Sequence, residues 1–295
     1  MSDVANAYMK LTENFTQWAQ TEDNIRAAII IGSRARFDHP ADDWSDLDIV
    51  IFAQEPEIYL NNSKWLSTFG SPWLSFVEPT RDQKYMELRA LFADGLDVDF
   101  VPQPVSLLED MFKNGFSRDF VEIINRGIRF LVDKDGFSSQ LQKSRIPLLK
   151  YKTPTQEEFH NLINNFWYYA VWTAKRLRRE ELWRAISACD NTMKKLLWTM
   201  MEWHALIPRE DEGSHSFQGQ FVERWADPRA LKVLPEIFAH YDLEDIWKAL
   251  FSTMELFNWM EHETARYLEY SLPDNGEKHT IDYISKLFEG RKQKE

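Results

Sequence analysis

The sequence has a single cysteine, Cys189, among 295 residues. One thiol forms no internal disulfide, so the sequence gives no sign of an oxidising compartment. No apolar run approaches the ~20 residues that a membrane-spanning helix needs. The first residues also lack a basic start followed by an apolar stretch, which is the pattern of a secretory signal. We therefore expect a cytoplasmic protein with no membrane partner.

Basic residues are too few to balance the acidic ones. Thirty-five Lys and Arg residues stand against 47 Asp and Glu residues, and the net charge is −12. Proteins that bind a nucleic acid backbone usually concentrate positive charge, because neutralised phosphates dominate their affinity. The field of this chain instead attracts a cationic small molecule. A nucleic-acid polymerase or a tRNA-tailing enzyme is therefore disfavoured, and no nucleic acid partner is expected.

The first part of the chain alternates short β-branched runs with amphipathic segments. The Asp94-Gly95 pair between two strand-like runs is a strong hairpin signal. Predicted strands are 25–31, 47–52, 73–77, 87–93, 97–102 and 129–132, and predicted helices are 4–18, 59–69 and 116–126. This mixture predicts a mixed sheet covered by helices, over residues 1–136.

Strand signals end near residue 137. We take 137–154, which contains two prolines, as a linker, and 155–290 as a second domain. Thr155 and Glu158 have the spacing of a capping box at a helix start. Further helices are predicted at 181–205, 217–226, 228–240, 243–270 and 281–288. The predicted fold class is therefore α+β, with a mixed-sheet domain followed by an all-α helical bundle.

Two carboxylates open the second predicted strand, at Asp46 and Asp48. Residues i and i+2 of a strand point to the same face, so these side chains project together. Neighbouring carboxylates repel each other and raise their own pKa values unless a cation lies between them. Mg²⁺ suits one or two carboxylates together with phosphate oxygens. The pair therefore predicts a magnesium site.

A third acid would complete the metal shell or take a proton from a hydroxyl group. Asp97 and Asp99 stand two residues apart on the later hairpin strand, and we prefer Asp99 because Asp97 lies closer to the turn. Gly-Ser is a common turn and Asp-x-Asp is a common pair, so neither is specific alone. Their combination indicates a site, because Gly-Ser ends one apolar strand, Asp-x-Asp opens the next and a further Asp interrupts a third. Burying three carboxylates at strand positions without a cation or donors is costly.

A glycine–serine turn ends the first strand at Gly32 and Ser33. Glycine lets a backbone approach a phosphate closely, and Ser33 offers an N–H and a hydroxyl to it. Arg34 and Arg36 follow, and guanidinium groups neutralise phosphate charge. The turn therefore predicts a phosphate-binding loop beside the metal pair.

These residues resemble the nucleotidyltransferase superfamily, whose pattern is Gly-Ser, a spacer, Asp-x-Asp and a third acid on a later strand. More narrowly, the chain resembles the aminoglycoside 6-adenylyltransferase (streptomycin adenylyltransferase) family. The likeness includes IGSRARFDHPADDWSDLDIVIF and LFADGLDVDFVP in the first domain, and NNFWYYAVWTAKRLRREELWRAISACDN and MKKLLWTMMEWHA in the second. It covers most of the chain and is weakest at 53–85 and 205–240.

The resemblance implies a nucleotidyltransferase domain and a helical domain with ATP and an antibiotic bound between them. It implies Mg²⁺-dependent transfer of AMP from ATP to a hydroxyl group of an aminoglycoside, streptomycin, with release of pyrophosphate. The residues it assigns are Asp46, Asp48 and Asp99 for metal and catalysis, with Asp99 as ligand or base, and Gly32, Ser33, Arg34 and Lys175 for the nucleotide.

The acceptor is less sharply defined. Streptomycin carries guanidinium groups that carboxylates receive, and Asp97 and Asp190 are candidates, although Asp190 equally suits a solvated helix face or an interhelical cap. Family members associated with streptomycin often have an acid where this chain has Asn165. The alternatives are another small-molecule or protein hydroxyl as acceptor, or an inactive nucleotide-binding protein of the same fold, against which the intact acids argue. The chain is expected to be a monomer or a homodimer.

Overall fold

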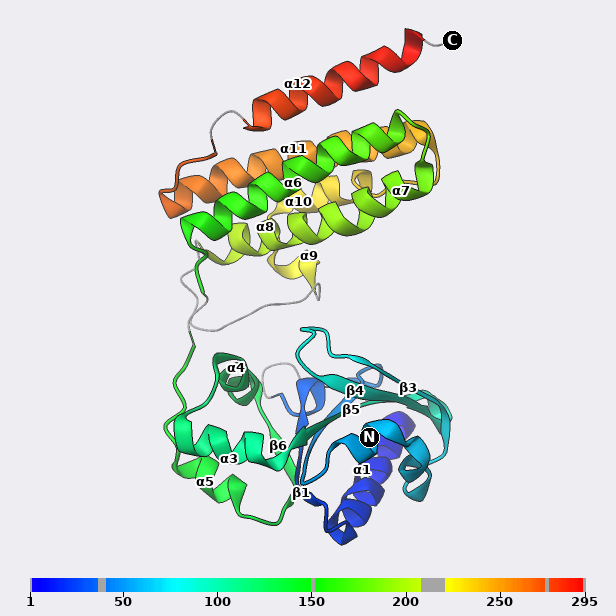
Figure 1. The fold of residues 1–295 in the computed structure, drawn as a ribbon, viewed down its shortest axis with the longest axis vertical. Coiled ribbons are helices and arrows are strands. Elements are labelled where there is room, and N and C mark those ends of the chain that lie inside the picture. Colours follow the sequence, from blue (N-terminus) through cyan, green and yellow to red (C-terminus); the bar gives the residue numbers. More distant parts are fainter. Residues whose placement is uncertain (1, 37–40, 150–151, 208–220, 274–275, 294–295) are drawn as a thin grey trace. The chain divides into compact units, whose positions relative to one another are not determined.

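The computed structural model describes residues 2–36, 41–149, 152–207, 221–273 and 276–293 (Figure 1). The chain divides into two compact units, Met1–Leu149 and Lys150–Glu295. The first unit contains a six-stranded sheet, and the described secondary structure of the second is helical. The predicted α+β class, with a mixed sheet followed by a helical bundle, is confirmed.

The sheet has the strand order β3-β4-β5-β2-β1-β6. The strands are β1 (Ile25–Ile31), β2 (Leu47–Ala53), β3 (Pro72–Pro79), β4 (Met86–Phe92), β5 (Leu96–Pro104) and β6 (Arg129–Asp133). The central pair, β2 and β5, is parallel, and every other pair is antiparallel. All six predicted strands are present, and the β4–β5 hairpin turns at Asp94 and Gly95, which both have positive φ.

Helices cover both faces of the sheet. On one face, α1 (Asp3–Thr21) packs Leu11 and Phe15 against Ile30, Ile49 and Phe100. On the other face lie α3 (Val105–Asn114), α4 (Arg118–Arg126) and α5 (Phe137–Lys143), whose buried side chains cluster with those of β1 and β2. Because side chains alternate along a strand, consecutive residues of β1 and β2 pack into the hydrophobic clusters on opposite faces of the sheet in turn.

Three elements differ from the predictions. The predicted helix 59–69 is broken into α2 (Glu57–Asn61) and a 3-10 helix (Ser63–Thr68), because Asn62 is extended and its side chain accepts from the Lys64 N–H. Helix α3 was not predicted. Helix α5 lies inside the predicted linker 137–154, and the Asp133 carboxylate accepts from the N–H groups of its first turn.

The second unit contains α6 (Gln156–Leu177), α7 (Leu182–Ser187), α8 (Lys194–Leu206), α9 (Val222–Trp225), α10 (Pro228–Val233), α11 (Leu243–Leu268) and α12 (Gly276–Glu289), with short 3-10 helices at Leu234–Glu236 and Gly290–Gln293. The capping box of Thr155 and Glu158 is confirmed at the start of α6. A π-helical turn, Ala188–Met193, joins α7 to α8, so the predicted helix 181–205 is nearly continuous. Residues 217–220 of the predicted helix 217–226 lie outside the described residues.

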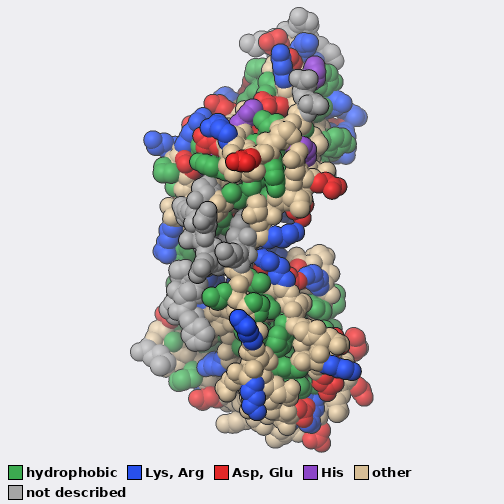
Figure 2. All heavy atoms as spheres, turned by 90° about the vertical axis from the view of Figure 1, so that its left-hand side faces the viewer, with side chains coloured by type: hydrophobic (Ala, Val, Ile, Leu, Met, Phe, Trp, Pro, Cys, Tyr) green, Lys and Arg blue, Asp and Glu red, His purple; other side chains and the backbone are tan. Residues whose placement is uncertain are grey.

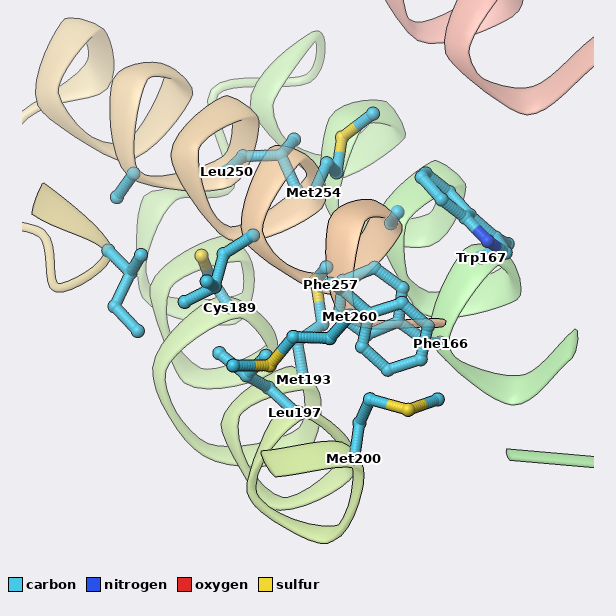
Figure 3. Packing of buried hydrophobic residues seen from close by; sticks show 14 of the residues in the cluster. Phe166, Trp167, Cys189, Met193, Leu197, Met200, Leu250, Met254, Phe257 and Met260 are labelled. Atoms are coloured by element: carbon cyan, nitrogen blue, oxygen red, sulfur yellow. The ribbon is translucent and has the colours of Figure 1, made fainter. Parts of the chain in front are cut away.

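The core of the second unit is built from aromatic rings and sulfur-bearing side chains (Figure 3). Phe166 of α6 stacks on Phe257 of α11, with ring centroids 3.6 Å apart, while Cys189 and Met193 pack beside them. Cys189 is fully buried, and burial raises the pKa of its thiol to about 11. The cysteine is therefore a packing residue.

Acidic and basic side chains are interspersed over the face of the molecule drawn in Figure 2. The negative net charge is thus not gathered into one field on that face. Within the described residues, no helix is long and apolar enough to cross a bilayer.

Candidate functional site

The three predicted carboxylates meet at the centre of the sheet. Asp48 of β2 lies beside Asp99 of β5 in the parallel register, and Asp46 precedes β2 on the same face. Oxygens of Asp46, Asp48 and Asp99 all lie within 4.8 Å of one another. Asp99 is 4% exposed, and the other two are partly buried. This spacing is short enough for one hard cation to contact an oxygen of each residue.

The electrostatics of this cluster, Asp46, Asp48 and Asp99, is unfavourable without a cation. Burial, followed by the charges of Asp46 and Asp99, raises the pKa of Asp48 to about 8. Burial and then Asp99 also raise the pKa of Asp46. No donor among the described residues hydrogen-bonds the Asp48 carboxylate. A divalent cation would stabilise a buried carboxylate that lacks donors and has two other acids beside it, so these residues fit Mg²⁺.

Gly32 is required by the position of Asp48. It ends β1 with φ +67°, and a Cβ built on it would lie 2.0 Å from Asp48 Oδ2. A side chain at this position would therefore displace the carboxylate. Close approach of a phosphate to the backbone is the role predicted for Gly32, and the structure adds a second reason for glycine, which is space for the Asp48 carboxylate.

Ser33 and Arg34 hold the loop that leads into β2. The Ser33 hydroxyl donates to the Asp46 carbonyl oxygen at 3.5 Å. The Arg34 guanidinium donates to the carbonyl oxygens of Asp46 at 2.9 Å and Ser45 at 2.5 Å, and it lies 3.4 Å from the ring centroid of Tyr8. Arg34 is thus engaged in positioning Asp46. The contact with phosphate predicted for it stays a prediction.

The sequence reasoning missed Arg89 and Glu87 on β4. Arg89 lies opposite Asp99 in the hairpin and donates from Nε and Nη2 to the two Asp99 oxygens, at 2.8 and 2.6 Å. This bidentate pair fixes the plane of the Asp99 carboxylate. Glu87 lies on the same face, 3.7 Å from Arg89 Nε, and its charge contributes to the raised pKa of Asp48.

Asp97 lies on the same face of β5 as Asp99 but is exposed, and its backbone N–H donates to the Tyr8 hydroxyl at 3.0 Å. Partial desolvation and the charge of Asp99 raise the pKa of the Asp97 carboxyl. It is therefore a neighbour of the cluster rather than a member of the group that shares one point. Its predicted role toward the acceptor stays a prediction.

Two further candidates lie in the second unit. Asp190 accepts from Lys194 Nζ at 3.5 Å and from the Ala239 N–H at 3.3 Å, so it links the π-helical turn to the segment before α11. This contact matches the interhelical cap that was its alternative interpretation. Lys175 of α6 lies 5.6 Å from the ring centroid of Tyr283 on α12. Asn165 is exposed on α6.

Comparisons with known proteins match nearly the whole chain. A family model described as streptomycin adenylyltransferase matches residues 6–287. The aminoglycoside 6-adenylyltransferase of Bacillus subtilis (strain 168) is 26% identical over 275 residues, which are 91% of this chain and 93% of that protein. The protein of the same name from Campylobacter jejuni is 25% identical over 271 residues, or 88% and 89%. A crystal structure of an aminoglycoside 6-adenyltransferase from Bacillus subtilis covers 94% of this chain and 97% of its own, with 22% identity and a TM-score of 0.45.

Proposed function

This chain belongs to the streptomycin adenylyltransferase family, and we propose that it transfers AMP from ATP to a hydroxyl group of an aminoglycoside, with streptomycin as the acceptor and pyrophosphate as the second product. Its curated relatives are named aminoglycoside 6-adenylyltransferases, and the chain is a nucleotidyltransferase. The observation that carries the proposal is the meeting of three carboxylates within 4.8 Å beside the Gly32 turn.

Asp46, Asp48 and Asp99 are the residues that would hold Mg²⁺. When bound there, the ion would neutralise charge that develops on the α-phosphate and on the departing pyrophosphate. The repulsion among the three carboxylates gives the protein a reason to take up the ion, because a cation restores the charged form of Asp48.

The residues around the cluster orient the reactants. The backbone of Gly32 and Ser33 binds the triphosphate at the end of β1, where no Cβ obstructs the approach. Arg34 keeps Asp46 in place by holding its carbonyl oxygen. Asp99, with its plane fixed by Arg89, either binds the metal or accepts the proton of the acceptor hydroxyl. The phosphate contact that the family resemblance implies for Lys175 stays a prediction.

The test is an acceptor screen with labelled ATP and mass spectrometry of the products, run with Mg²⁺ and with EDTA. We expect streptomycin to gain one adenylyl group, in a Mg²⁺-dependent reaction that Asp48→Asn abolishes. Asp110→Asn, an exposed acid on α3, is the control and retains activity. Normal turnover by Asp48→Asn would refute the metal role. Transfer only to a different hydroxyl compound would show that streptomycin is not the acceptor. ATP binding without pyrophosphate release would indicate an inactive relative.

A further inference from the structure

The helical unit contains a cavity of about 380 Å³ that the mechanism above does not use. It is bounded by α6, α11 and the start of α12. Aromatic side chains of α6 line one side, and carboxylates of α11 and α12 line the other. The residues used in the argument are Trp167, Tyr168, Trp172, Glu261 and Glu277. Mostly apolar walls with a few convergent polar groups are typical of small-molecule sites.

Glu261 is the unusual member of this lining. It is 1% exposed, yet it lines the cavity from the middle of α11. Among the described residues, the only donor that reaches it is the Trp167 indole N–H, which lies 3.2 Å from each oxygen. A carboxylate has about four acceptor positions, so most of its capacity is unfilled. Burial, with a further contribution from Glu277, raises the pKa of Glu261 to about 9.

A second carboxylate faces the same place. Glu277 accepts from Asn258 Nδ2 and lies 3.0 Å from His262 Nε2, so its position is fixed by α11. Ligand atoms of Glu261, His262 and Glu277 lie within 4.8 Å of one another. Two carboxylates that converge on an apolar cavity, one of them buried and short of donors, favour a positively charged occupant.

The volume and the aromatic walls of the cavity favour an organic cation over a bare metal ion. An ion bound by three side chains needs no cavity of this volume, whereas a ring bearing a cationic group fills it. The aromatic walls suit such a group as well, because guanidinium and ammonium ions are attracted to ring faces. Trp172 already stacks with the Arg176 guanidinium at 4.5 Å. Trp167 lies at the edge of the packed core drawn in Figure 3, with its indole nitrogen away from the methionines.

We propose that this cavity binds a guanidinium or ammonium group of the acceptor molecule, with Glu261 as the principal ion-pair partner and the aromatic side chains of α6 as its walls. The inference rests on the proposed function for the identity of the acceptor. It assigns the carboxylate of substrate recognition to α11, at a position that no sequence motif marked. Lys175 also lines the cavity. Its positive charge repels other cations, so it limits the number of cationic groups that the cavity accepts.

The first measurement is calorimetric binding of streptomycin without ATP and in EDTA. Glu261→Gln keeps the size of the side chain and an acceptor for Trp167 but removes the charge, and we expect at least tenfold weaker binding. Glu263→Gln is the matched control, because Glu263 lies on the same helix but contacts His204 and does not line the cavity. It is expected to bind within twofold of the wild type. Thermal melting checks that each variant is folded.

The second measurement separates this inference from the proposed activity. In steady-state assays, Glu261→Gln should raise the KM for streptomycin at least tenfold and leave the KM for ATP unchanged. Binding that depends on Glu261 without any adenylylation would support the cavity and reject the proposed function. Adenylylation with an unchanged streptomycin KM in Glu261→Gln would overturn the inference and leave the function standing. Loss of Mn²⁺ binding in Glu261→Gln, with streptomycin binding intact, would identify a metal site and also overturn it.

Discussion

Asp48→Asn should make the metal-free protein more stable at alkaline pH while abolishing activity. The pKa of Asp48 is about 8 in the folded chain, compared with 3.8 for an unperturbed carboxyl. Between these two values the unfolded chain has released a proton that the folded chain retains. Stability contributed by this group therefore falls as the pH rises from about 4 to about 8, and it stays low above that. Asparagine has no proton to lose, so the variant escapes this penalty.

The magnitude follows from the same shift. Each pKa unit corresponds to ~1.4 kcal/mol, so the rise from 3.8 to about 8 sets a ceiling of about 6 kcal/mol. Because Asp48 is only partly buried, water and side-chain rearrangement screen its charge, and we expect about 2 kcal/mol at pH 8.5. For a unit of this size, that is an increase in Tm of roughly 4–8 °C.

The assay is differential scanning calorimetry in EDTA at pH 5 and pH 8.5, with Asp110→Asn as the exposed control. The gain of Asp48→Asn over the wild type should be largest at pH 8.5 and mostly gone at pH 5. Added Mg²⁺ should stabilise the wild type at pH 8.5 and have little effect on the variant. A variant no more stable than the wild type at pH 8.5, or an equal gain at both pH values, would refute the raised pKa of Asp48 that burial and then the charges of Asp46 and Asp99 produce.

Three further changes test other parts of the structure. Gly32→Ala should cost at least 100-fold in kcat with intact folding, because its Cβ would collide with Asp48; activity near the wild type would show that the carboxylate moves freely. Arg89→Lys should lower kcat about tenfold or more, since one ammonium cannot replace the bidentate contact with Asp99, and an unchanged rate would remove the orienting role. Thr155→Ala should lower the unfolding free energy of the helical unit by ~1 kcal/mol in urea titrations without affecting the metal site, and no change would mean that the capping box is not stabilising.

The fold was predictable where local signals are strong and agree with tertiary packing. The run of β-branched residues at β1 and the Asp94-Gly95 turn predicted their elements closely. The failures occur where a single side chain changes the outcome. Asn62 ends α2 by capping the next 3-10 helix, and Asp133 caps α5 from the end of β6. Both contacts are made by capping side chains just before a helix, which hydrophobic periodicity does not report.

The meeting of the three carboxylates was predictable because Asp46 and Asp48 mark the start of β2 and Asp99 lies within β5. Arg89 was missed, since β4 was identified without its register against β5. The turn signal alone was not enough, because a two-residue loop at Asp94-Gly95 would pair position 90 with Asp99, whereas the observed connection Ala93–Gly95 is one residue longer and pairs Arg89 with Asp99. Glu261 had no such signal. It stands within an ordinary amphipathic helix, and its burial depends on how α6, α11 and α12 assemble.

The two carbonyl contacts of Arg34 have a consequence for how the enzyme can diversify. By tying the end of β1 to the start of β2, this one side chain closes the intervening segment at its base. The entropic cost of closing a loop rises slowly with its length, by about 0.6 kcal/mol for each doubling. A change in the length of this segment therefore leaves Asp46 and the start of β2 in place.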